Sequence, residues 1–133
     1  MVKLLADTSA LLALMWRDDR NHAAAARFVR EHPQARFLLT DLVLSELVTR
    51  LRARSSAERA TSAAASLLES RRYELVFVDA EVLRGALEHM RRFADKRLSL
   101  ADGASFEVME RLRLDAAFTF DRDFRDCGLK MVP

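Results

Sequence analysis

The chain has 133 residues, of which 50% are hydrophobic, and its formal net charge is only +2. This size and composition predict one domain with a single core over residues 1–133. One cysteine and three scattered histidines exclude an intramolecular disulfide and offer no zinc cluster, and the longest early apolar run, residues 11–16, is far shorter than the roughly 18 residues that a membrane-spanning helix needs. We therefore expect an unprocessed cytoplasmic protein with no membrane segment, since a secretion signal is also missing.

Strands and helices alternate along the chain. The strands are expected at residues 2–6, 36–40, 73–78 and 116–120, with a last short one at 129–132. The helices are expected at residues 9–16, 21–31, 41–54, 56–70, 79–93 and 99–112. This alternation predicts an α/β fold with a largely parallel sheet that is covered by helices on both faces.

Arginine dominates the basic residues. Lysine supplies three of the 22 basic residues, so 19 are arginine. Arginine binds phosphate through two parallel hydrogen bonds and stacks on bases, so this bias is compatible with a nucleic-acid ligand. With 20 acidic residues alongside, the same bias also fits ordinary ion pairs on helix surfaces, or a GC-rich genome. Composition alone leaves these interpretations open.

Four carboxylates lie where apolar segments end or turn: Asp7, Glu46, Asp102 and Asp121. Asp7 and Asp121 each follow a predicted strand directly, which places both at the sheet edge where parallel sheets bind ligands. A carboxylate among apolar side chains needs a cation or a proton, so four of them suggest a shared metal ion. Carboxylate ligands favour Mg²⁺ or Mn²⁺ over zinc.

Each acid also has an ordinary structural explanation. Asp7 could cap the helix that follows it, and Asp102 has the spacing of a helix capping box. Glu46 could form a surface ion pair with Arg50, and Asp121 could form an Asx turn or cap a short helical turn. The chain, however, lacks the motifs of the competing catalytic sites: GxSxG, the Walker loop, GxGxxG, HExxH and a cysteine–histidine pair.

Four segments give the chain a resemblance to the PIN-domain nucleases, specifically to the VapC-type toxin ribonucleases of toxin–antitoxin pairs. They are LLADTSALLAL at residues 4–14, LSEL at 44–47, LSLAD with Ser105 and Phe106 at 98–106, and FTFDRDF at 118–124. The resemblance implies a PIN-like three-layer α/β/α fold with a mainly parallel central sheet. Gly103 departs from it slightly, because a small alanine is more usual at this position.

The resemblance also implies roles for individual residues. The catalytic acids would be Asp7, Glu46, Asp102 and Asp121, with Mg²⁺ or Mn²⁺ held by Asp7, Asp102 and Asp121. Supporting roles would fall to Thr8, Ser105 and Asp123, the last in a variable position. The implied activity is metal-dependent hydrolysis of RNA phosphodiester bonds, and the implied partners are RNA, a small antitoxin and a second copy of the chain.

Two other functions stay open on the sequence. The first is a PIN nuclease that works in RNA processing or DNA repair without an antitoxin. The second is a non-catalytic acidic signalling or binding domain, such as a receiver-like domain. A receiver would carry a pair of acids after its first strand and a late lysine in a clear motif, and Lys130 has no such motif around it. The RNA target cannot be read from the sequence.

Overall fold

The computed structural model describes residues 2–133 and contains one five-stranded sheet in the order β3-β2-β1-β4-β5. Its strands are β1 (Lys3–Ala6), β2 (Arg36–Thr40), β3 (Tyr73–Val76), β4 (Ala117–Phe118) and β5 (Met131–Val132). Every neighbouring pair of strands is parallel. The predicted α/β class with a mainly parallel central sheet is therefore confirmed.

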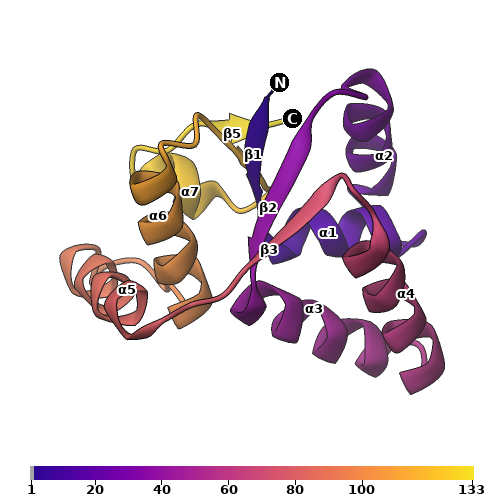
Figure 1. The fold of residues 1–133 in the computed structure, drawn as a ribbon, viewed down its shortest axis with the longest axis horizontal. Coiled ribbons are helices and arrows are strands. Elements are labelled where there is room, and N and C mark those ends of the chain that lie inside the picture. The colour runs from indigo at the N-terminus through magenta and orange to yellow at the C-terminus, as the bar shows by residue number, and fades with distance from the viewer. Residues whose placement is uncertain (1) are drawn as a thin grey trace.

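Helices cover both faces of this sheet. The described residues form α1 (Thr8–Met15), α2 (His22–Glu31), α3 (Asp41–Arg54), α4 (Ala57–Glu69), α5 (Ala80–Arg92), α6 (Leu100–Leu112) and α7 (Arg122–Asp126). Figure 1 shows α1 to α4 on one side of the strands and α5, α6 and α7 on the other. This is the three-layer arrangement expected from the sequence. No helix within residues 2–133 has the length and apolar character needed to cross a bilayer.

Two hydrophobic cores follow from the alternation of side chains along the strands. Leu4 of β1 packs into the core under α1 to α4, whereas its neighbour Leu5 packs into the core under α5 to α7. Phe118 and Ala117 of β4 divide in the same way. Phe118 stacks on Phe28 of α2 with ring centroids 5.3 Å apart. Burial of such an aromatic ring stabilises the fold by about 1.5–3 kcal/mol.

Two predicted strands end earlier than the sequence suggested. β3 ends at Val76 because the next backbone groups leave the sheet: the Val78 N–H donates to the Asp41 carboxylate at 3.0 Å. β4 spans only Ala117–Phe118, and after it the chain turns into the short helix α7. Both departures occur at the carboxyl edge of the sheet.

A glycine allows α5 and α6 to pack closely. A Cβ atom at Gly103 of α6 would lie 2.6 Å from the Ala86 carbonyl oxygen of α5, a distance that no real Cβ tolerates. The glycine at this position, where the resemblance suggested alanine, therefore has a packing reason in this chain.

An ion-pair cluster also joins α5 and α6. His89 Nε2 lies 3.1 Å from Glu107 Oε1 and 3.6 Å from Glu110 Oε2. Glu107 accepts a second hydrogen bond from Arg111 Nε at 2.7 Å, and these partners lower the pKa of its carboxyl, with Arg111 contributing most. The cluster holds the two helices together by pairing each carboxylate with a side-chain cation or a histidine ring.

Candidate active site

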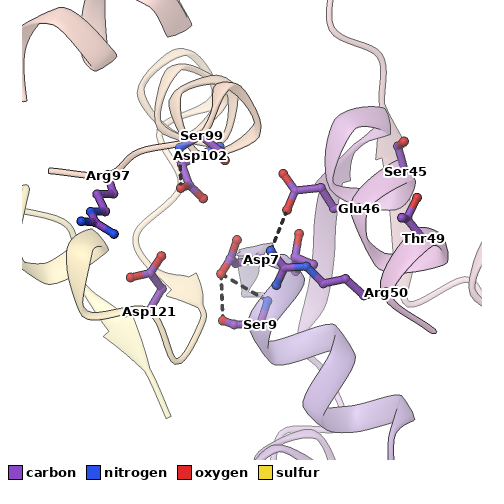
Figure 2. A pocket seen from close by; sticks show the side chains of 11 residues that line it. Asp7, Ser9, Ser45, Glu46, Thr49, Arg50, Arg97, Ser99, Asp102 and Asp121 are labelled. Atoms are coloured by element: carbon purple, nitrogen blue, oxygen red, sulfur yellow. Dashed lines mark hydrogen bonds and ion pairs between the residues drawn. The ribbon is translucent and has the colours of Figure 1, made fainter. Parts of the chain in front are cut away.

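All four predicted acids line one cavity at the carboxyl edge of the sheet. The cavity has a volume of about 420 Å³ and is lined by Asp7, Glu46, Asp102 and Asp121 from four different parts of the chain (Figure 2). Hydroxyl side chains and two arginines complete its walls: Thr8, Ser9, Ser45, Thr49, Ser99, Arg50 and Arg97. Carboxylates that lie at least 19 residues apart in the sequence are thus brought together by the fold.

Asp7 is the most deeply buried of the four acids, with 4% of its surface exposed. It follows β1 and caps α1 by accepting a hydrogen bond from the Ser9 N–H. Its Oδ2 also accepts hydrogen bonds of 2.8 Å from the hydroxyls of Ser9 and Thr119. Burial raises the pKa of the Asp7 carboxyl, and the hydrogen bonds from Thr119 and Ser9 partly oppose that rise. The carboxylate is therefore fixed in orientation before any cation arrives.

Ser9 and Thr119 connect the ends of β1 and β4. The Ser9 hydroxyl accepts from the Phe120 N–H at 2.9 Å, and the Thr119 hydroxyl accepts from the Asp121 N–H at 3.0 Å. Each hydroxyl thus joins the Asp7 carboxylate to the backbone that carries Asp121. Sequence reasoning missed both residues. The one available signal was a polar Thr119 between two phenylalanines at the end of an apolar strand.

Asp102 serves the helix and the cavity at once. Its Oδ2 accepts from the Ser99 N–H at 3.0 Å, while its own N–H donates to the Ser99 hydroxyl at 3.0 Å, which completes a capping box at the start of α6. Burial, together with the charges of Asp7 and Asp121, raises the pKa of Asp102 from 3.8 to about 6, although the hydrogen bonds from Ser99 oppose the rise. A bound cation would relieve this repulsion among the three aspartates.

Glu46 and Asp121 face each other across the cavity from α3 and the start of α7 (Figure 2). Glu46 Oε2 lies 3.6 Å from the Arg50 guanidinium, and 31% of the Glu46 side chain is exposed. Asp121 caps α7, with its Oδ1 accepting from the Asp123 N–H at 2.9 Å. The i,i+4 ion pair of Glu46 and the helix cap of Asp121, which the sequence offered as structural explanations, are thus both present. The same two acids also line the cavity.

Of the three predicted supporting residues, one lines the cavity and two lie outside its lining. Thr8 lines it and is buried. Ser105 is fully buried in α6 outside the cavity lining, and its hydroxyl has no hydrogen-bond partner within residues 2–133. Asp123 lies in the first turn of α7, also outside the lining, and contacts Asp121 through its backbone N–H.

The donor set of this cavity suits a hard divalent cation, because it consists of carboxylate and hydroxyl oxygens. Within residues 2–133 a tighter group, with ligand atoms all within 4.8 Å of one another, is formed by His89, Glu107 and Glu110. That group is already paired with Arg111 through Glu107. Among the described residues, no three of the four cavity acids form a group as tight as this one.

Comparison with known proteins gives relatives over nearly the whole chain. The family model described as PIN domain matches residues 4–129. The 23S rRNA-specific endonuclease VapC20 of Mycobacterium tuberculosis is 31% identical over 129 residues, which cover 97% of each chain. A crystal structure of Mycobacterium tuberculosis VapC20, described as a sarcin-ricin loop cleaving toxin, has a TM-score of 0.87 at 30% identity over 95% of both chains.

A more distant structure has the same fold. VapBC2 from Rickettsia felis, solved with a DNA fragment from its promoter, has a TM-score of 0.73 at 12% identity, covering 98% of this chain and 97% of the other. At this low identity the likeness concerns the fold alone.

Proposed function

Because the chain belongs to the PIN-domain family, we propose that it is a metal-dependent endoribonuclease and the toxin of a type II toxin–antitoxin pair, with one PIN-like domain over residues 1–133. The observation that carries this proposal is the convergence of Asp7, Glu46, Asp102 and Asp121 on one cavity. The similarity to an rRNA endonuclease over 97% of the chain supports the same reaction.

Three aspartates would hold the metal ion, Mg²⁺ or Mn²⁺: Asp7, Asp102 and Asp121. When bound there, the ion would lower the pKa of a coordinated water and would neutralise charge that develops on the scissile phosphate. Asp7 is kept in place by the Ser9 and Thr119 hydroxyls, and Asp102 by the first turn of α6. The protein thus provides ligands that need no rearrangement when the ion binds.

Glu46 would act on the water. Its Oε2 faces Arg50, which leaves Oε1 free to accept a proton from the attacking water or to orient it. The one hydroxyl of the lining that donates to a carboxylate, Ser9, is held between Asp7 and the Phe120 N–H, so we propose that hydrolysis proceeds by direct attack of water on phosphorus rather than through a covalent intermediate. The remaining hydroxyls of the lining, such as Thr8 and Ser99, would help to orient water around the carboxylates.

The substrate and partners follow from the relatives. Since the 31% identical protein is named a 23S rRNA-specific endonuclease, we propose ribosomal RNA as the substrate of this chain. The VapBC2 structure of the same fold supports a small antitoxin as partner, which we place near the acidic cavity. The homodimer of the toxin is proposed from the family resemblance alone. The site of action would be the cytoplasm, where ribosomes and a reduced Cys127 are both found.

The test uses purified protein freed of any antitoxin. We expect cleavage of ribosomal RNA with Mg²⁺ or Mn²⁺ and none in excess EDTA. Asp7→Asn should abolish cleavage while the circular dichroism spectrum stays that of the wild type, because asparagine can still accept the hydrogen bonds of Ser9 and Thr119. Cleavage that persists in EDTA, or in Asp7→Asn, would refute the proposal. Mapping the cut on whole ribosomes by primer extension would identify the target.

A further inference from the structure

Two arginines reach the acidic cavity from opposite walls. Arg50 extends from α3 on the side of Glu46, and Arg97 lies in the loop before α6 on the side of Asp121 (Figure 2). The acids Asp7 and Asp102 lie between the two guanidinium groups in this view. The cavity therefore combines a carboxylate centre with a positive charge on each of two sides.

Neither arginine is held as a structural arginine would be. Arg72, for comparison, donates hydrogen bonds to the carbonyls of residues 29, 32 and 35 and so joins distant segments of the chain. Arg97 is exposed and makes no hydrogen bond or ion pair within residues 2–133. Among the described residues, Arg50 forms an ion pair only with Glu46, at 3.6 Å, and 53% of its side chain is exposed. An exposed pair of this kind contributes little to stability.

A polyanionic substrate needs such groups at this place. Four carboxylates repel RNA phosphates, and a metal ion between three of them offsets only part of that charge. Guanidinium groups bind phosphate through two parallel hydrogen bonds, and they do so most readily when no structural partner has to be given up. Arg97 has no structural partner to give up. Arg50 would give up only its contact with Glu46 Oε2 when it turns to a phosphate.

We infer that Arg97 and Arg50 bind the RNA backbone on either side of the cleaved bond, so that the strand crosses the acids between them. Arg97 contacts a phosphate on the Asp121 side and Arg50 a phosphate on the Glu46 side. This inference rests on the proposed ribonuclease function and adds the direction in which the strand lies. The contacts are to backbone phosphate, so they fix the position of the RNA without reading its sequence.

The experiment measures binding of a fluorescent single-stranded RNA to full-length protein over a series of salt concentrations, in an Asp7→Asn background that does not cut. For each lost phosphate contact, the slope of log affinity against log salt should become shallower by about 0.7. We expect this change in Arg97→Ala and again in Arg50→Ala, with affinity about tenfold lower or more in each. Arg97→Lys should keep the slope, since it keeps the charge.

A matched control comes from α2. Arg30 is exposed there and its side chain makes no hydrogen bond or ion pair within residues 2–133, so Arg30→Ala should leave both the affinity and the slope unchanged. In the cutting enzyme, Arg97→Ala should raise KM more than it lowers kcat, because a phosphate beside the cleaved bond is bound before and during the reaction. Thermal melts of Arg97→Ala, with and without Mg²⁺, should match the wild type.

The outcomes separate this inference from the proposed function. If the wild type cuts RNA while Arg97→Ala and Arg50→Ala, each in the Asp7→Asn background, keep the slope of Asp7→Asn alone, the two arginines do not contact phosphate and the inference is wrong. If the wild type neither binds nor cuts RNA, the proposed function itself fails. Should Arg97→Ala melt early, Arg97→Gln, which is closer in size, is measured in its place with the same expected slope.

Discussion

Replacing Asp102 with asparagine should stabilise the metal-free protein at neutral pH, although it removes a residue of the site. Burial and the neighbouring Asp7 and Asp121 charges raise the pKa of Asp102 to about 6, which means that its ionised form costs free energy in the folded state. Asparagine keeps an oxygen that can accept from the Ser99 N–H and carries no charge. The capping box therefore survives while the repulsion disappears.

The size of the effect follows from the pKa. A rise from 3.8 to about 6, at about 1.4 kcal/mol per pKa unit, corresponds to an upper limit of about 3 kcal/mol. Asp102 is only partly buried, so water screens the repulsion and an effect of about 1–2 kcal/mol is expected. In a protein of this length that free energy raises the Tm by roughly 3–8 °C.

The pH dependence has a defined sign. Between pH 3.8 and about 6 the folded state binds more protons at Asp102 than the unfolded state. The contribution of Asp102 to the stability of the wild type should therefore fall as pH rises through this interval and stay level above it. The advantage of Asp102→Asn should appear over the same interval and vanish at lower pH, where Asp102 is protonated in both states.

The assay is a series of thermal melts in EDTA at increasing pH, with Asp18→Asn as a control at an exposed acid outside the cavity. Saturating Mg²⁺ should reverse the order of the two melting temperatures, because the ion raises the apparent stability of the wild type by mass action. In Asp102→Asn the ion finds one ligand fewer, so the stabilisation is smaller. If Asp102→Asn melts below the wild type in EDTA at every pH, Asp102 is not destabilised by its neighbours and the electrostatic reasoning fails.

Three further substitutions test separate parts of the structure. Thr119→Val should lower the free energy of unfolding in urea by about 1–3 kcal/mol, because the buried Asp7 carboxylate loses a donor; an unchanged midpoint would contradict the network. Gly103→Ala should cost about 1–3 kcal/mol in the same assay by forcing α5 and α6 apart, and a stabilised variant would show that α5 yields easily. Glu46→Gln should keep Mg²⁺-dependent stabilisation but lower kcat about 100-fold or more; near-normal cleavage would remove Glu46 from proton transfer.

The layers of the fold could be predicted from local patterns. Strand and helix periodicities are local properties, and the alternation of Leu4 and Leu5 between the two cores is the ordinary consequence of extended backbone. The strand order β3-β2-β1-β4-β5 could not be obtained in this way, because it depends on pairing between segments far apart in the chain. The early end of β3 depends on such a contact too, from Val78 to Asp41.

The candidate site, like the fold, could be predicted only as far as local patterns in the sequence reach. Asp7 and Asp121 follow strands, so their common edge could be deduced before the fold was known. The positions of Glu46 and Asp102 depend on how α3 and α6 pack against that edge, which no local pattern contains. Thr119 was missed because its partner, Asp7, lies 112 residues away. The capping explanation of Asp102 was correct as well, since one carboxylate can hold a helix end and face a cavity at once.

The most direct test of the metal site is a crystal grown or soaked with Mn²⁺ and measured for anomalous scattering. We expect the Mn²⁺ peak in the cavity among Asp7, Asp102 and Asp121, and its loss in crystals of Asp7→Asn. A peak only at His89, Glu107 and Glu110, the tighter cluster between α5 and α6, or no peak at either place at saturating Mn²⁺, would contradict the assignment of these acids as the catalytic metal ligands.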